Sequence, residues 1–274
     1  MANDVAVAAL PPAKVLRTKQ GRAISYREAG SGTPLVLLHG IGSGSASWES
    51  QLGLPGYRTI AWDAPGYGGS DPLPDAKPKT KDYADALAAF LDALGIKQAY
   101  IVGHSLGGLM AGSFARHYPD RVLRLMLLAP ATGYGTASAE LREQKLRERL
   151  DVLDSLGPLG MAEKRSHVLL SPNASPEALA KVKAVHATIK PDGYRQAVYM
   201  LNGGDLRGDG AHIRARTVVV CGTADVVTPE KGCKLIAEAV PGARYVALPG
   251  LGHCANVEGP AAYNKVLSEF LAAA

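Results

Sequence analysis

Short apolar runs without polar interruption recur along the chain, and glycines or polar residues bound each of them. The clearest runs lie at residues 34–39, 99–102 and 217–221. A strand that is apolar on both sides must be covered on both faces, which is typical of parallel sheets packed between helices. A turn around Gly21 is expected to join two further strands, residues 15–18 and 24–28, in a hairpin. The remaining predicted strands are residues 58–63, 123–128 and 244–248.

Three other segments place apolar residues three or four positions apart, which predicts amphipathic helices. They are residues 82–94, 106–117 and 260–271, and Gly95 ends the first of them. Because strands alternate with helices, the sequence predicts an α/β fold with a mostly parallel, doubly wound sheet of about eight strands.

Residues 132–211 break this alternation. They are rich in helix-forming residues, contain no convincing β-branched run, and carry several Gly and Pro turn signals. The sheet pattern resumes after them, which favours an insertion over a separate domain. We therefore expect an α/β core of residues 1–131 and 212–274, and a helical lid, or cap, of residues 132–211.

Charge and composition exclude several partners. The net charge is +5 and the pI is near 9.0, but acids and bases are interspersed, so we expect no nucleic-acid partner. Three cysteines at irregular spacing predict neither a disulfide framework nor a zinc site.

No apolar run approaches the roughly 20 residues that span a bilayer. Residues 1–13 lack the basic start of a secretion signal, so we expect a flexible leader, no membrane partner and a cytoplasmic location.

The strongest chemical signal is at residues 103–107, which read Gly-His-Ser-Leu-Gly and fit the pattern G-x-S-x-G. They join a predicted strand to a predicted helix, which is the setting of a nucleophile elbow. Glycines at both ends let neighbouring backbone approach, and the helix N-terminus offers N–H groups to a developing oxyanion. We therefore expect Ser105 to be a nucleophile.

Around this motif the chain resembles the α/β-hydrolase fold family, over residues 34–130 and 214–272. The segments that carry the resemblance, besides the elbow, are His39-Gly40, residues 63–70, residues 222–225 and Gly252-His253. The resemblance is to the serine hydrolase branch of the family, including 3-oxoadipate enol-lactonases and carboxylesterases.

The resemblance implies a catalytic triad and an oxyanion hole. The family orders its triad Ser, acid, His along the chain, and Asp225 and His253 follow Ser105 in that order. Asp225 would orient His253, and His253 would act as general base. The backbone N–H groups of Ile41 and Leu106 would form the oxyanion hole.

Two other patterns point to different chemistry and are weaker. Residues 40–44 are glycine-rich, but a dinucleotide fingerprint would need glycine at position 45, which is serine, and we predict no helix that starts cleanly there. Asp63 and Asp71 are isolated acids without nearby histidines, which is weak evidence for a metal site. The chemistry expected at Ser105 requires neither a metal nor an organic cofactor.

The substrate is expected to be a small molecule whose identity the lid decides. The resemblance implies hydrolysis of a carboxylic ester or lactone through an acyl-enzyme. Two alternatives stay open: a carbon–carbon hydrolase acting on a ring-cleavage diketone, and a ligand receptor with this fold. The candidate substrate-binding residues are Trp48, Tyr134, Arg165 and Tyr199.

Overall fold

One eight-stranded sheet organises the computed structural model, which describes residues 10–273. The strands are β1 (Lys14–Arg17), β2 (Ala23–Ala29), β3 (Thr33–Leu38), β4 (Tyr57–Trp62), β5 (Ala99–His104), β6 (Val122–Leu128), β7 (Thr217–Gly222) and β8 (Arg244–Leu248). Their order across the sheet is β1-β2-β4-β3-β5-β6-β7-β8. Strand β2 is antiparallel to β1 and β4, and all other neighbours are parallel, which confirms the predicted fold class.

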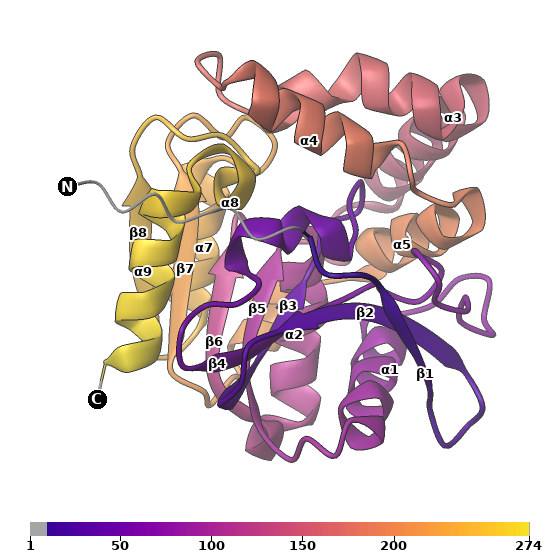
Figure 1. The fold of residues 1–274 in the computed structure, drawn as a ribbon. Coiled ribbons are helices and arrows are strands. Elements are labelled where there is room, and N and C mark those ends of the chain that lie inside the picture. Colours follow the sequence, from indigo (N-terminus) through magenta and orange to yellow (C-terminus); the bar gives the residue numbers. More distant parts are fainter. Residues whose placement is uncertain (1–9, 274) are drawn as a thin grey trace.

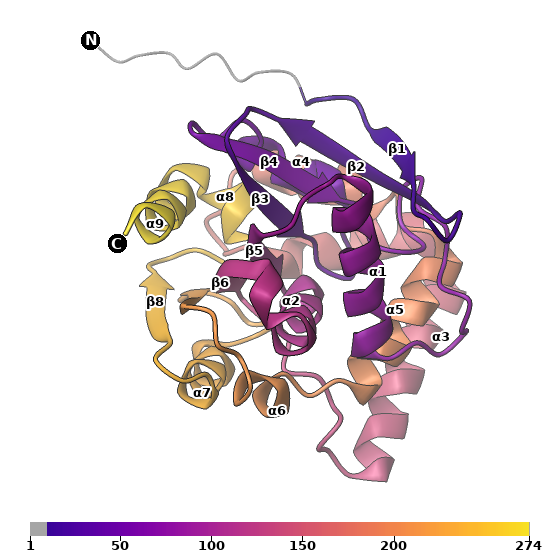
Figure 2. The same cartoon turned by 90° about the horizontal axis from the view of Figure 1, so that it is seen from below.

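Helices cover both faces of this sheet (Figure 2). They are α1 (Thr80–Ala93), α2 (Leu106–His117), α7 (Glu230–Ala239), α8 (Ala255–Glu258) and α9 (Pro260–Ala272), with short 3-10 turns η1 (Ser45–Gln51) and η2 (Pro119–Arg121). Strand β3 shows why both faces are apolar: Val36 and Leu38 belong to the apolar cluster that includes α1 and α2, whereas Leu35 and Leu37 belong to the cluster that includes α9 and η1. None of the described helices is long and apolar enough to cross a bilayer.

The chain between β6 and β7 is helical, and no strand occurs in it. It contains α3 (Ala139–Arg165), the 3-10 turn η3 (Ser166–Leu169), α4 (Pro176–His186), α5 (Pro191–Gly203) and α6 (Leu206–Gly210). Helix α3 is kinked at Gly157, whose backbone is non-helical (φ 60°, ψ 178°), just before Pro158. Helices α3 and α4 lie above the sheet at the top of Figure 1.

Strand and helix ends differ from the prediction by a residue or two, and the elements η1, η2, α7 and α8 were not predicted. The turn η1 begins inside the glycine-rich loop where we expected no helix, because the Asp63 carboxylate accepts a hydrogen bond from Ser45 N (2.8 Å). That acceptor lies 18 residues away, so no local signal marks the start. Most of the predicted leader, residues 1–13, lies outside the described residues.

Candidate active site

Ser105 lies in a strained turn between β5 and α2. Its backbone has φ 53° and ψ −115°, a conformation that L-residues rarely adopt. The glycines around it are required by close backbone contacts. A Cβ atom on Gly103 would lie 2.3 Å from the carbonyl oxygen of Gly107, and one on Gly107 would lie 2.2 Å from that of Leu38. The turn is therefore closed tightly on itself and packed against the end of β3.

Asp225 and His253 come together at the carboxyl ends of β7 and β8. His253 Nδ1 lies 2.8 Å from Asp225 Oδ2, and both residues are buried. The backbone N–H groups of Val227 and Thr228 donate to Asp225 Oδ1, at 2.7 and 2.9 Å. Burial raises the pKa of Asp225, but hydrogen bonds from His253 and Thr228 outweigh it and lower the pKa to about 2. The carboxylate therefore stays charged.

Thr228 is a part of this cluster to which the sequence reasoning gave no role. Its hydroxyl lies 2.8 Å from Asp225 Oδ2, 3.1 Å from His253 Nδ1 and 3.0 Å from the carbonyl oxygen of Ala129. Ala129 follows β6 and has a positive φ of 44°. The hydroxyl thus ties the acid and the imidazole to the end of a third strand. The sequence signal that could have indicated this role is a threonine three residues after Asp225.

The loop that carries His253 is fixed on both sides. His104 Nε2 donates to the carbonyl oxygen of His253 (3.0 Å), and burial lowers the pKa of His104 to about 3, so it stays neutral. On one flank Gly252 N donates to Glu258 Oε2 (2.9 Å). On the other, Cys254 N donates to the carbonyl oxygen of Leu169 (2.8 Å), which belongs to the helical insertion.

Two unbonded backbone N–H groups, those of Ile41 and Leu106, belong to residues that line the same cavity as Ser105. Within residues 10–273 neither group has an acceptor. The loop of Ile41 is held by its neighbours: Tyr67 donates to the carbonyl oxygen of Ile41 (2.8 Å), and His39 Nδ1 donates to that of Gly40 (2.8 Å). Because His39 Nε2 accepts a hydrogen bond from a backbone N–H, the imidazole is neutral.

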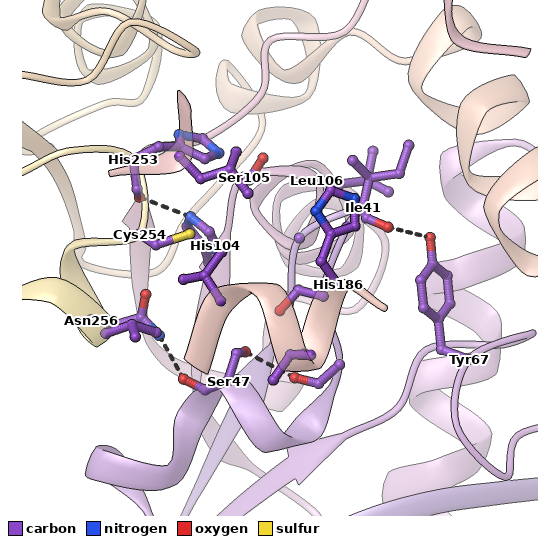
Figure 3. A pocket seen from close by; sticks show the side chains of 18 of the residues that line it. Ile41, Ser47, Tyr67, His104, Ser105, Leu106, His186, His253, Cys254 and Asn256 are labelled. Carbon is purple, nitrogen blue, oxygen red and sulfur yellow. Dashed lines mark hydrogen bonds between the residues drawn. The ribbon is translucent and has the colours of Figure 1, made fainter. Parts of the chain in front are cut away.

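A cavity of about 770 Å³ lies over Ser105. Its walls come from the sheet's loops and from the helical insertion, and Figure 3 shows Ser105, His253, Ile41 and Leu106 around it. Asp225 lies behind His253, outside the lining. Of the four predicted substrate-binding residues, Tyr134 and Arg165 line the cavity.

The other two predicted substrate-binding residues lie elsewhere, which corrects the expectation. Trp48 is fully buried in the core, with its ring 6.4 Å from those of His104 and Tyr263, because η1 turns it toward α9. Tyr199 contacts Lys77 instead: the Lys77 ammonium group lies over the Tyr199 ring, 5.2 Å from the centre of the ring. His186 and Tyr67 line the cavity instead, and neither was among the candidates.

The close contact at Gly107 predicts that an alanine at this position destabilises the protein. Gly107→Ala should lower the free energy of unfolding by about 1–3 kcal/mol, because the new Cβ overlaps the Leu38 carbonyl. Gly232→Ala, in α7 with open space around its Cβ position, should instead raise it by about 0.5–1 kcal/mol. Urea unfolding of both variants would measure this, and equal effects would contradict the packing argument.

The lowered pKa of Asp225 predicts how stability depends on pH. The folded value of about 2 lies below the unfolded value of about 3.9, so the carboxylate stabilises the fold above pH 4 and loses that effect as pH falls toward 2. Relative to Asp225→Asn, the gain should be on the order of 2 kcal/mol at pH 7 and roughly half of that at pH 3. Urea unfolding at both pH values tests this, and an unchanged difference would count against it.

Comparison with known proteins agrees with this architecture. A family model described as the alpha/beta hydrolase fold matches residues 33–260. The chain is 29% identical over 265 residues to a 2-hydroxy-6-oxo-6-phenylhexa-2,4-dienoate hydrolase of Burkholderia cepacia, and the match covers 91% of each protein.

Solved structures of similar proteins cover almost the whole chain. A thermophilic esterase from Thermogutta terrifontis is 25% identical with a TM-score of 0.84, over 95% of this chain and 98% of that one. An enol-lactonase from Burkholderia xenovorans LB400, 24% identical with a TM-score of 0.84 over 94% of this chain and 99% of that one, shares the fold. Because the family match includes both the serine turn and the histidine loop, the chain belongs to the α/β-hydrolase fold family and is a hydrolase, as its motifs predicted.

Proposed function

We propose that this protein is a serine hydrolase that cleaves a small-molecule carboxylic ester or lactone through an acyl-enzyme. Ser105 is the nucleophile, His253 the general base and Asp225 the acid of its triad. The observation that carries the proposal is the 2.8 Å contact between Asp225 and His253, with His253 beside the cavity that Ser105 enters from a strained turn.

The hydrogen-bonding pattern supports the role of His253. A carboxylate only accepts, so His253 Nδ1 carries a hydrogen and Nε2 of the neutral ring is free to take the proton of Ser105 Oγ. The serine oxygen then bonds to the substrate carbonyl carbon, and the N–H groups of Ile41 and Leu106 stabilise the oxyanion. His253 returns the proton to the leaving alcohol, and water releases the acid by the same steps.

The helical insertion supplies the substrate-specific part of the cavity. We propose that residues 132–211 act as a cap on a core of residues 1–131 and 212–274. Tyr134 and Arg165 reach the cavity from this cap and contact the substrate. No cofactor has a role in the proposed reaction. The expected cytoplasmic location stays a prediction.

A second candidate is carbon–carbon bond hydrolysis of a ring-cleavage diketone. The name of the Burkholderia cepacia relative describes a dienoate substrate, which carries a carboxylate. Arg165 is an exposed residue that lines this cavity, and within residues 10–273 its guanidinium has no ion-pair partner. It could therefore receive the carboxylate of such a substrate.

Substrate panels on matched serine variants test these proposals. Ser105→Ala should lower kcat/KM for p-nitrophenyl acetate by at least about 10³-fold, because no other group in the triad can form the acyl bond. Ser47→Ala is the matched control: its hydroxyl also borders the cavity but is bonded to the Gly44 carbonyl, so activity should stay within about twofold. Equal activity of wild type and Ser105→Ala would refute the proposal.

The same panel separates the two candidate reactions. Turnover of esters and lactones well above that of a 2-hydroxy-6-oxo-dienoate supports the ester hydrolase. The reverse order, with loss in Ser105→Ala, would favour the carbon–carbon hydrolase and reject the first choice.

A further inference from the structure

His186 is a buried histidine to which the proposed reaction gives no role. It ends α4 in the cap and lines the cavity over Ser105. Only 5% of its surface is exposed. The rings of His39 and His104 hold backbone in place, whereas the ring of His186 makes a single hydrogen bond within residues 10–273, to a side chain of the cap.

That bond favours the tautomer with the hydrogen on Nε2. His186 Nδ1 lies 3.2 Å from Ser166 Oγ, which is fully buried. Within residues 10–273 the Ser166 hydroxyl has no other acceptor, and a buried hydroxyl hydrogen is rarely left unpaired. With Ser166 as the donor to Nδ1, the hydrogen of the neutral ring is on Nε2, and a partner for it can enter from the cavity that His186 lines. Burial, and then the charge of Arg165, lower the pKa of His186 to about 4, so the ring is neutral at pH 7.

The Nε2–H group faces the loop of Ile41. A Cβ atom on Gly42 would lie 3.1 Å from His186 Nε2, and one on Gly40 would lie 3.1 Å from Ser105 Cβ. These glycines flank Ile41, and consecutive Cα atoms are about 3.8 Å apart. His186 Nε2 therefore lies beside the loop that carries the Ile41 N–H, next to the glycine that follows Ile41. No acceptor for it is found within residues 10–273.

The side on which His186 lies indicates which part of the substrate it meets. Figure 3 shows His253 on one side of Ser105, and Ile41 with His186 on the other. The leaving group must face His253, which protonates it. The acyl group, which stays on Ser105 after the leaving group departs, is therefore the part of the substrate that can reach the side of His186.

We propose that His186 Nε2–H donates a hydrogen bond to a second oxygen of the acyl group. The favoured substrates are esters or lactones with a keto or hydroxyl oxygen one or two carbons from the scissile carbonyl. Such an acyl group can place its carbonyl oxygen at the Ile41 N–H and its second oxygen at His186. This inference rests on the proposed hydrolase function and names the acyl class that the site takes.

Paired esters test the proposal. For wild type and His186→Phe, kcat/KM is measured with ethyl 2-oxobutanoate, ethyl 3-oxobutanoate and ethyl butanoate. The phenyl ring keeps the bulk and removes the donor, so the variant should lose about tenfold on at least one keto ester and less than about twofold on the plain ester. Comparing variants with the same ester cancels the higher intrinsic reactivity of keto esters. Equal losses on all three esters, or none, would overturn the proposal.

A second variant separates loss of the donor from loss of structure. The side-chain amide of glutamine can place an N–H group near the position of Nε2, so His186→Gln should recover most of the preference for the keto ester. Failure of this rescue in a variant whose melting temperature matches wild type would overturn the proposal.

Binding to a protein that cannot turn over distinguishes failure of this inference from failure of the proposed function. In Ser105→Ala, isothermal titration should find at least one of the two keto esters bound about tenfold more tightly than ethyl butanoate, and Ser105→Ala/His186→Phe should remove the difference. If wild type hydrolyses no ester, the hydrolase proposal fails, yet this titration still decides the role of His186. If esters are hydrolysed but the titration shows no difference, only the inference about His186 fails.

Discussion

The approach of the serine turn to the end of β3 is the contact on which the candidate site depends. Gly107 lies so close to the Leu38 carbonyl that no side chain fits between them, and Gly103 meets Gly107 in the same way. These contacts bring the start of α2 against the Ile41 loop. They place the two unbonded N–H groups at one cavity and hold Ser105 in a conformation that a relaxed turn would not give it.

The histidine side of the candidate site is held by the sheet and the helical insertion together. Thr228 links the acid and the imidazole to the end of β6, and Glu258 and Leu169 hold the backbone on either side of His253. Ser171 of the helical insertion also donates to Glu258 through its backbone N–H (3.0 Å). The position of the His253 imidazole is therefore coupled to the packing of the insertion, and a change that shifts the insertion also acts on His253.

Local sequence determined the core well, because strand, turn and helix signals lie within a few residues of each other. The setting of Ser105, the strand ends before Asp225 and His253, and the helical stretch after β6 could all be predicted. The turn η1 could not, because its capping carboxylate comes from Asp63 in another loop. Trp48 and Tyr199 were misplaced for a related reason: composition indicates an aromatic side chain, but only tertiary packing decides which way it faces. The sequence shows a histidine at position 186, but it does not show which ring nitrogen donates, because that depends on the contact with Ser166, 20 residues away.

The central claim is that Ser105 is an activated nucleophile, and covalent labelling tests it most directly. A fluorophosphonate probe reacts with a serine hydroxyl only where a base and an oxyanion site activate it. Mass spectrometry of the labelled, digested protein should find a single adduct, on the peptide that contains Ser105. Folded wild-type protein that stays unlabelled, or an adduct on another serine, would contradict the account.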